Sequence, residues 1–503
     1  MEKLKKDENY RHILRYTGIF GSVQGLNILV GIVRNKFTAL FLGPSGMGLL
    51  SLFNSTSSFL VSACNLGIPT SGVKMVADSM SAQANKESLK NDDKPLSASR
   101  DMAVCLVRSF SFLAALLGLL VCIILGPLIN LFSFSWGNHT LHFILLAPTV
   151  FFTILAGGEM AVLKALGELK ALAMQSLWLV VLSLLFSVPI YGWFGESGIL
   201  AVLFLLAFSQ WALNFRYSRR AASFRLNFSK MELLKGIPLL RLGLSFVLAG
   251  MANSGAEFLV RAFLNMQGDL EVVGLFNAGV SIVIVYAGMV FSVMESDYYP
   301  RLSTIVGNRL EADVVTKRNL TVNQQLETNV LLMGPIVAVM ILALPVGIPI
   351  LYDSHFMGML GMAQVASISM LFKALYLPVE YLPLSRGESK VFLVQETLCV
   401  LLLVVSEIVG YLLGGLYGLG VGIAIAYGIE AIAILVFSRL YYGYRLSTLG
   451  GRAVVVHLLL GLFTLGITAI DYHRLVYWGL GVLGVLASSY YSFRLISRNL
   501  KNS

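Results

Sequence analysis

Long apolar runs separated by short polar segments follow one another along almost the whole chain. Most of these runs hold 20 or more residues, which is enough for an α-helix to cross a hydrocarbon core about 30 Å thick. Fourteen transmembrane helices are the best count; twelve stays open because the last two runs are short and 197–217 is arguable. The expected spans are 16–42, 46–68, 103–130, 142–164, 171–192, 197–217, 240–265, 272–294, 327–352, 358–383, 390–413, 416–438, 453–470 and 475–494.

Composition agrees with an all-α polytopic membrane protein. Of the 503 residues, 57% are hydrophobic and 13% are charged, and the mean hydropathy is +0.78. Soluble domains carry about 25% charged residues, so a water-soluble globule is excluded, as are a disordered chain, collagen and a disulfide-rich scaffold. The longest polar segment, 69–102, is rich in Ser, Lys and Asp, and we expect a cytoplasmic linker there.

Signatures of catalysis and of metal binding are missing from the sequence. The four cysteines, Cys64, Cys105, Cys122 and Cys399, stand singly in apolar runs, as small buried hydrophobic residues do. The six histidines form no HExxH motif, and no Ser/His/Asp elbow occurs. The sequence therefore predicts a protein that is not an enzyme and that holds no cofactor and no metal ion.

Lysine and arginine are distributed unevenly over the expected loops. Of these 37 residues, 31 fall on the side of the N-terminus, four fall on the opposite side and two lie within spans. The positive-inside rule therefore places both termini in the cytoplasm. The basic N-terminus is not a signal peptide, because the apolar run behind it is long and has no small-residue cleavage site. The net charge of +10 is thus a topology signal, and nucleic acid is not an expected partner.

The two halves of the chain carry a weak internal repeat. Short matches occur in the same order on the first two spans of each half, and both first spans start on the cytoplasmic side. A parallel repeat of this kind predicts two six-helix lobes with a cavity between them. We expect an N-terminal lobe at 1–230, a C-terminal lobe at 231–445 and an extra helix pair with a cytoplasmic tail at 446–503. The matches pair Leu14-Arg15, Val33-Arg34 and Leu52-Phe53-Asn54 with Leu240-Arg241, Val260-Arg261 and Leu275-Phe276-Asn277.

Polar residues inside the expected spans fall on single helical faces. Polar groups in hydrocarbon must face protein or water, so these faces should point inward. Ser and Asn also join helices to one another, and this alternative stays open for the span 46–68. The faces consist of Ser51, Asn54, Ser55, Ser58, Ser62 and Asn65 on 46–68, of Gln24, Asn27 and Arg34 on 16–42, and of Asn253, Glu257 and Arg261 on 240–265.

Arg34 and Arg261 occupy equivalent places in the repeat, near the far end of the first helix of each lobe. A charge inside the membrane costs about 2.5–3.5 kcal/mol on insertion scales, and guanidinium groups match phosphate oxygens. Two arginines facing one cavity would therefore attract an anionic headgroup. The alternatives are a local pair of Arg261 with Glu257 and an interfacial Arg34 beside Lys36. The candidate substrate-binding residues are Gln24, Asn27, Arg34, Asn54, Asn253, Arg261 and Asn277.

Carboxylates within spans can bind protons or Na⁺ in an ion-coupled carrier. No spacing rule identifies which carboxylate would do so, and the candidates are Glu257, Glu396 and Glu407. Glu159 precedes Lys164 by five residues, which is a poorly phased pairing on a helix. The other ionisable residues expected inside spans include Lys373, Glu380 and Glu430.

Three segments resemble Wzx-type polysaccharide flippases. The run LGPSGMG at 42–48, followed by NLGIPTSGVK at 65–74, resembles the start of these proteins. The run DYYPRL at 297–302 resembles the end of helix 8 in their O-antigen translocase branch. The likeness covers roughly residues 10–440 and is strongest in the first 80 residues and around 270–305.

The resemblance implies membership of the superfamily that also holds MATE drug exporters and the lipid II flippase. Its members have two six-helix lobes, cytoplasmic termini and alternating access between inward-open and outward-open states. By similarity to arginines that line such cavities, Arg34 and Arg261 become candidates for binding a diphosphate or an acidic sugar. The helix pair in 453–494 lies outside the twelve-helix core; in the lipid II flippase the corresponding pair forms a groove for the lipid tail.

Together these observations favour a flippase that moves a polyprenyl-diphosphate-linked oligosaccharide from the cytoplasmic to the periplasmic leaflet. The cargo would be an O-antigen or a related surface-glycan unit, as used in lipopolysaccharide biosynthesis. The expected partners are undecaprenyl-diphosphate-linked oligosaccharide, membrane lipids, H⁺ or Na⁺, and other glycan-assembly proteins, all at the bacterial cytoplasmic (inner) membrane. A MATE-like drug or cation antiporter is the main alternative. A membrane glycosyltransferase or polymerase is the alternative from another class, and the short, carboxylate-poor loops oppose it.

Overall fold

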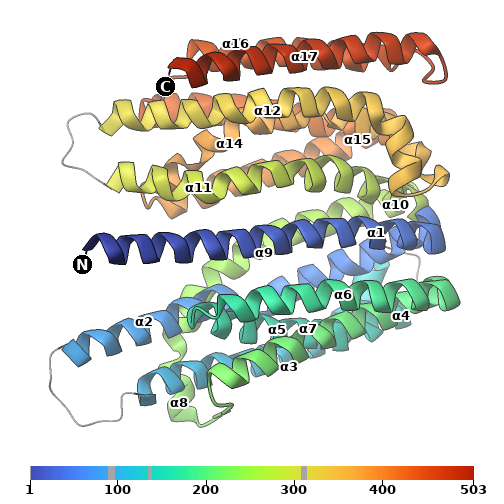
Figure 1. Ribbon diagram of the computed structural model, residues 1–503. Coiled ribbons are helices and arrows are strands. Elements are labelled where there is room, and N and C mark those ends of the chain that lie inside the picture. The colour runs from blue at the N-terminus through green and yellow to red at the C-terminus, as the bar shows by residue number, and fades with distance from the viewer. Residues whose placement is uncertain (1, 89–96, 134–138, 308–313, 503) are drawn as a thin grey trace. The chain divides into compact units, whose positions relative to one another are not determined.

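The computed structural model describes the backbone of residues 2–88, 97–133, 139–307 and 314–502, and most of their side chains from Leu29 onward. Within these ranges every regular element is helical and no β-strand occurs (Figure 1). Nine helices in the described ranges are long and apolar enough to cross a membrane, or ten if one bent pair counts as a span. The expectation of an all-α polytopic membrane protein is confirmed.

The chain folds into two compact units, residues 1–270 and 271–503, which we call unit 1 and unit 2. Unit 1 contains α1 (Glu2–Cys64), α2 (Ile68–Ser88), α3 (Ser97–Ser133), α4 (Thr140–Leu145), α5 (Ala147–Ala165), α6 (Leu169–Phe194), η1 (Gly195–Gly198), α7 (Ile199–Ala221), α8 (Lys230–Lys235) and α9 (Ile237–Gln267). Unit 2 contains α10 (Leu270–Val280), the π-helical η2 (Ser281–Tyr286), α11 (Ala287–Gly307), α12 (Val314–Leu351), η3 (Ser354–Met359), α13 (Leu360–Ala366), α14 (Ser369–Ser385), α15 (Ser389–Tyr442), α16 (Thr448–Ile467) and α17 (Leu475–Asn502).

Three of the candidate spans contain a break that divides the helix in two. The spans are Leu29–Cys64 with 36 residues, Lys170–Ala221 with 52 and Ser389–Tyr442 with 54. They break at Gly43-Pro44, at the turn η1 and at Gly414-Gly415, respectively. Gly43 and Gly415 adopt positive φ, which glycine tolerates because it has no Cβ. Each of the fourteen expected spans is helical over most of its length, and each broken segment holds two of them. The expected spans 46–68, 327–352 and 453–470 run past a helix end, and 358–383 crosses the bend between α13 and α14.

Helix α9 packs against α1 and α2 within unit 1. Phe59 of α1 stacks on Phe258 of α9, with ring centroids 5.9 Å apart. Gly67, between α1 and α2, adopts a φ of 68°, and a Cβ on it would lie 2.2 Å from the carbonyl oxygen of Gly243 in α9. The sequence assigns this helix to the second lobe. The lobe boundary at 230/231 and the parallel repeat stay predictions, because contacts group helices by packing and not by repeat.

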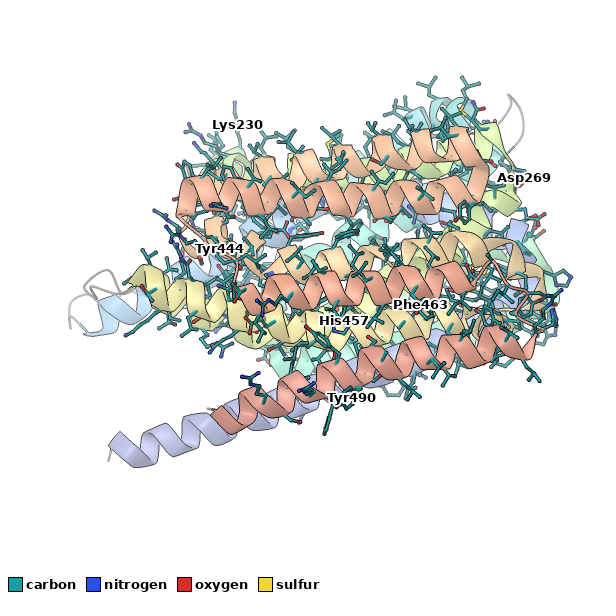
Figure 2. All side chains as sticks on the ribbon, turned by 90° about the horizontal axis from the view of Figure 1, so that it is seen from above. Lys230, Asp269, Tyr444, His457, Phe463 and Tyr490 are labelled. Carbon is teal, nitrogen blue, oxygen red and sulfur yellow. The ribbon has the colours of Figure 1, made fainter. Side chains whose placement is uncertain are left out.

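The extra helix pair, α16 and α17, packs on α12 within unit 2 (Figures 1 and 2). His457 of α16 is buried, and its two ring nitrogens lie 2.9 Å from Ser488 Oγ and 3.1 Å from Ser492 Oγ of α17. Tyr490 of α17 is labelled in Figure 2 and points outward, with 66% of its surface exposed. Helices α16 and α17 are therefore joined by a polar contact between them, while Tyr490 lies on an exposed face of α17.

The turn between α16 and α17 is built on Asp471. Its carboxylate accepts a hydrogen bond from the backbone N–H of His473 at 3.0 Å and lies 2.8 Å from the ring of the same residue. These bonds stabilise the ionised form and lower the pKa of Asp471.

The two halves of α15 touch through glycine, as the GxxxG spacing in 410–428 predicts. A Cβ on Gly410 would lie 2.3 Å from the carbonyl oxygen of Gly418, and one on Gly418 would lie 2.2 Å from that of Gly410. A Cβ on Gly422 would lie 2.1 Å from the carbonyl oxygen of Ser406. Any larger residue at these positions has to push the halves apart.

Replacing Gly422 by alanine should destabilise unit 2, because overpacking against a backbone atom costs about 1–3 kcal/mol or more. We expect the purified Gly422→Ala protein in detergent to unfold several degrees below the wild type in a thermal melt. Gly466→Ala in α16 is the matched control, since nothing lies within 4 Å of the added methyl group. Equal midpoints for the two variants would contradict the packing argument.

Candidate functional site

A polar cavity of about 490 Å³ lies inside unit 1. The two halves of α1, together with α5, α6 and α7, supply its walls. Nine of its fifteen lining residues are polar, and one of these is cationic while none is acidic. The polar lining residues are Arg34, Asn54, Ser57, Ser58, Ser62, Thr149, Thr153, Ser183 and Gln210.

Helical spacing explains how these residues reach one space. Asn54, Ser58 and Ser62 recur every four residues on α1, and Thr149 and Thr153 do so on α5, so each set lies on one helical face. The polar face predicted on 46–68 is thus divided. Part of it lines the cavity, and part makes other contacts: Ser51 with α9, Ser55 with the carbonyl oxygen of Leu52, and Asn65 with the N–H of Gly67.

The guanidinium of Arg34 lines this cavity and has few hydrogen-bond acceptors and no counter-ion among the described residues. Within the described ranges its one hydrogen bond is long, 3.4 Å from Nη2 to Asn35 Oδ1. Tyr191 of α6 is its electrostatic neighbour, and no carboxylate in the described part of the chain pairs with it. A guanidinium has five N–H donors, so most of those on Arg34 are available to a bound anion.

Arg261 makes a different set of contacts. Its Nε donates to Ser51 Oγ of α1 at 2.7 Å, and its Nη1 lies 3.3 Å from Glu257 Oε2, one turn earlier on α9. Its side chain is 12% exposed, and it is not among the residues that line the cavity. The local pair with Glu257 is therefore present, and Arg261 also joins α9 to α1 one turn before Asn54.

The remaining candidate substrate residues are dispersed. Asn253 of α9 is exposed, and Asn277 of α10 is half-buried in unit 2, where its carbonyl oxygen accepts from Ser281. Gln24 and Asn27 lie outside the residues whose side chains are described. Of the seven candidates, the structure brings Arg34 and Asn54 together in one cavity.

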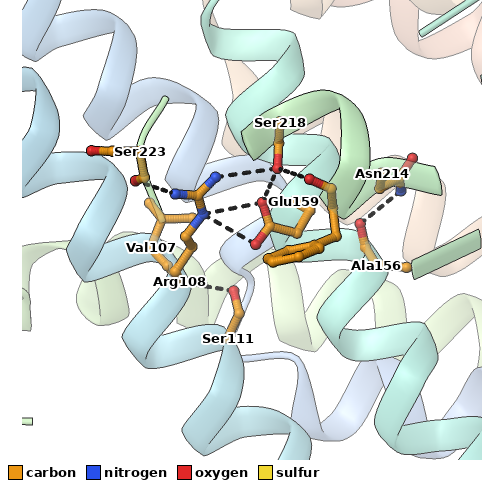
Figure 3. A network of polar contacts seen from close by, with 9 residues as sticks. Val107, Arg108, Ser111, Ala156, Glu159, Asn214, Ser218 and Ser223 are labelled. Carbon is orange, nitrogen blue, oxygen red and sulfur yellow. Dashed lines mark hydrogen bonds and ion pairs between the residues drawn. The ribbon is translucent and has the colours of Figure 1, made fainter. Parts of the chain in front are cut away.

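A buried ion pair joins three helices of unit 1 (Figure 3). Arg108 of α3 lies 3.1 Å from both carboxylate oxygens of Glu159 in α5, and both side chains are more than 90% buried. Ser218 of α7 donates to Glu159 and accepts from Arg108 Nη2 at 3.2 Å. Arg108 Nη1 also donates to the carbonyl oxygen of Ser223 at 2.7 Å.

This network has the contacts of a structural element. Every charged group in it has a partner, as a buried ion pair requires. The sequence does not reveal the pair, because Arg108 and Glu159 are 51 residues apart on different helices. Lys164, the neighbour weighed for Glu159 from the sequence, is exposed.

Unit 2 carries a cluster of ionisable residues inside its spans, on α14 and both halves of α15. The side chains of Glu380 and Glu396 are neighbours. The side chains of Tyr376 and Cys399 are neighbours of Glu430. Lys373 is an electrostatic neighbour of Glu380 and Glu430, and its ammonium lies 6.0 Å from the ring centroid of Phe291. We call Lys373, Glu380, Glu396 and Glu430 the unit 2 cluster.

Of the three carboxylates suggested for ion coupling, only Glu396 lies in the unit 2 cluster. Glu257 is exposed and paired with Arg261, and Glu407 is buried elsewhere on α15 with contacts of its own. Helical spacing could have pointed to Glu380, because Lys373, Tyr376 and Glu380 share one face of α14. Within the described residues no group of His, Cys, Asp and Glu has the arrangement of a metal site.

The segments that resemble Wzx-type flippases form turns and helix contacts. Gly43 and Pro44 break α1, and Asn65 and Gly67 form the turn before α2. The hydroxyl of Tyr298 donates to the carbonyl oxygen of Pro378 in α14 at 2.6 Å.

The fold matches those of solved membrane transporters. An inward-facing structure of a multidrug resistance MATE family transporter of the MOP superfamily aligns with a TM-score of 0.67 and 14% identity, over 83% of this chain and 94% of that one. A MATE protein in its bent conformation aligns with a TM-score of 0.54 and 15% identity, over 86% and 94%. A MOP superfamily transporter from Pyrococcus furiosus aligns with a TM-score of 0.52 and 15% identity, over 84% and 93%.

The chain has the fold of MATE transporters of the MOP superfamily. At 14–15% identity the likeness concerns the fold alone. No family model matches the sequence, and no curated protein matches it either. The MATE-like fold agrees with the superfamily that the Wzx-like segments suggest, while the Wzx branch itself stays a prediction.

Removing one partner of the Arg108–Glu159 pair should destabilise unit 1 strongly, because it leaves an uncompensated buried charge. We expect Glu159→Gln to lose about 3–5 kcal/mol of stability, seen as a lower thermal midpoint in detergent. The double variant Arg108→Met with Glu159→Leu removes both charges and should recover much of that loss. A double variant that melts as low as Glu159→Gln would show that the ion pair is not the source of the effect.

Proposed function

We propose that this chain is a MATE-fold transporter that flips a polyprenyl-diphosphate-linked oligosaccharide across the membrane. The observation that carries this proposal is the cavity of unit 1, with its hydroxyl and amide groups and the single guanidinium of Arg34. A diphosphate and a chain of sugars cannot enter hydrocarbon without polar partners. The cavity supplies such partners, and the polyprenyl tail stays in the lipid.

The charge of the cavity favours an anionic cargo over a cationic drug. Guanidinium groups bind phosphate oxygens through paired N–H donors, and the hydroxyl and amide groups around Arg34 suit a sugar. A cationic drug would call for carboxylates, and none lines the cavity. The MATE-like drug or cation antiporter is the second candidate, since two of the matched structures carry MATE in their descriptions. The Pyrococcus furiosus protein is described as having a binding pocket of reverse polarity that suggests a different function.

The setting of the transporter follows from the same proposal. We place it in the bacterial cytoplasmic (inner) membrane with both termini in the cytoplasm, where the excess of Lys and Arg belongs. Its cargo would be an undecaprenyl-diphosphate-linked O-antigen or related unit, and proteins of glycan assembly would supply it.

The unit 2 cluster is proposed as the site of proton coupling. Two ionised carboxylates side by side repel one another, and a proton on one of them removes this repulsion, so the neighbouring Glu380 and Glu396 suit the binding of a proton. The ammonium of Lys373 lies close to Glu380 and Glu430 and would repel a bound Na⁺. Loss and uptake of this shared proton is therefore the ion chemistry that the cluster suits best.

Arg34→Ala should slow the flipping of a fluorescent polyprenyl-diphosphate oligosaccharide in proteoliposomes. A hydrogen bond to a charged group contributes about 1.5–3 kcal/mol, so the expected loss is about tenfold to a hundredfold. Arg34→Lys should retain part of the activity, because a lysine keeps the charge but not the paired donors.

The control is Arg474→Ala, which removes an exposed arginine in the turn before α17. It should flip the substrate at the wild-type rate. Wild-type protein that expels a cationic dye but does not flip the oligosaccharide would support the drug antiporter instead. Full flipping by a folded Arg34→Ala protein would remove Arg34 from the substrate site.

Glu380→Gln and Glu396→Gln should each uncouple transport from the proton gradient. In proteoliposomes an imposed proton gradient should accelerate flipping by the wild type, and an imposed Na⁺ gradient should not. Each variant should keep a basal rate that no longer responds to the gradient, because an amide cannot release a proton.

Glu257→Gln serves as the control for a carboxylate outside the cluster and should still respond. A normal response by both cluster variants, or a response to Na⁺ alone, would contradict proton coupling at this place.

A further inference from the structure

The two halves of α15 enclose a groove in unit 2. Glycine contacts hold the halves together near the turn at 414–415, and a 2.7 Å hydrogen bond from the Tyr442 hydroxyl to Glu388 closes the other end. Between these points, residues within 390–399 and 433–441 line a space of about 490 Å³. We call this space the α15 groove.

The α15 groove lies on a surface of large apolar side chains. Val394, Leu398 and Tyr441, which line it, are 59%, 61% and 61% exposed. In the most apolar stretch of the span Ser389–Tyr442, 6% of the stretch is buried inside the protein. The corresponding share is 22–56% in the other eight candidate spans of the described chain. A surface of this kind faces hydrocarbon in a membrane, so the natural occupant is a lipid chain.

Two polar side chains interrupt the apolar lining and specify the lipid. Lys390 is exposed at the end of the groove far from the turn, and it forms no ion pair among the described residues. Arg386, by contrast, is paired with Glu388 at 3.2 Å. Gln395 lies five residues further on, or about 7.5 Å along the helix axis. Its Nε2 is buried and has no hydrogen-bond partner in the described part of the chain.

We propose that the α15 groove binds one anionic phosphoglyceride of the phosphatidylglycerol class. Lys390 pairs with the phosphate, and the Gln395 amide, which has no partner in its buried position among the described residues, turns into the groove and donates to an ester carbonyl of the same lipid. An acyl chain follows Leu398 and Phe437 toward Cys399. The distance from Lys390 to Cys399 is about 13.5 Å along the helix, which is long enough for about ten methylene groups.

Other lipids match this arrangement less well. In a polyprenyl diphosphate the hydrocarbon begins at the phosphate, so no carbonyl oxygen is present at the level of Gln395. A zwitterionic phosphoglyceride has the carbonyl but brings its own cation, which competes with Lys390 for the phosphate. Charge and hydrogen bonding therefore both favour a phosphoglyceride with net negative charge.

At its inner end the α15 groove reaches the unit 2 cluster, so a bound lipid would affect the surroundings of that cluster. Cys399 lines the groove, and its side chain is a neighbour of Glu430. The end of the acyl chain therefore lies against this contact and keeps water away from Glu430 on the lipid side.

Native mass spectrometry of the purified full-length protein, titrated with phosphatidylglycerol or phosphatidylcholine, tests the proposal. One equivalent of phosphatidylglycerol should bind about fivefold more tightly than phosphatidylcholine, as one lysine near an anionic lipid provides. Lys390→Ala should abolish this preference, and Gln395→Leu should weaken binding of both lipids. Val394→Trp should fill the groove and remove the tight equivalent, with an unchanged melting midpoint in lipid-free detergent showing that the protein is folded.

Lys170→Ala is the matched control, because Lys170 is also an exposed lysine at the start of a span. It should bind phosphatidylglycerol as the wild type does. Equal affinities for the two lipids, or equal effects of Lys390→Ala and Lys170→Ala, would reduce the groove to ordinary lipid contact and overturn the proposal. Displacement of the tight equivalent by undecaprenyl phosphate would assign the groove to a polyprenyl chain and overturn it as well.

Discussion

Hydrocarbon does not hydrate ions, so each charged side chain within a span needs a partner from the protein or from a ligand. In unit 1 this requirement is met in two ways. Each nitrogen of the Arg108 guanidinium has an acceptor, on Glu159, Ser218 or Ser223. Arg261 contacts Ser51 and Glu257. Both sets of contacts join helices that are distant in sequence. The same contacts therefore neutralise the charge and hold the helices together.

Arg34 departs from this pattern, and the departure is the reason for assigning it a ligand. Its guanidinium lines a space that contains hydroxyl and amide groups and no carboxylate. A charge that the fold leaves without a counter-ion within a membrane span is costly unless water or an anion occupies the space. The cavity at Arg34 thus has the residues expected of a binding site. The buried ion pair of Arg108 instead has the contacts expected of an interaction that holds helices together.

The helices could be predicted from the sequence because each depends on a local pattern. Apolar length and glycine or proline breaks are enough to separate α1 into two spans at Gly43-Pro44, and helical spacing is enough to place Asn54, Ser58 and Ser62 on one face. The pairings depend on tertiary packing. Glu159 meets Arg108 on another helix, and Glu396 meets Glu380 across the turn between α14 and α15. Neither pair has a spacing rule, so charges could be located in the spans but not matched with one another.

Helix α15 shows how a backbone feature can determine chemistry far along the chain. The glycines near its turn allow the two halves to touch, and this contact sets the distance between residues further from the turn. The same two halves supply Glu396 and Cys399 from one side and Glu430 from the other. A larger residue at the glycine contact would therefore change the separation of these groups as well as the packing. The glycines near the turn thus help to set the distances between the polar groups, although they carry no polar side chain themselves.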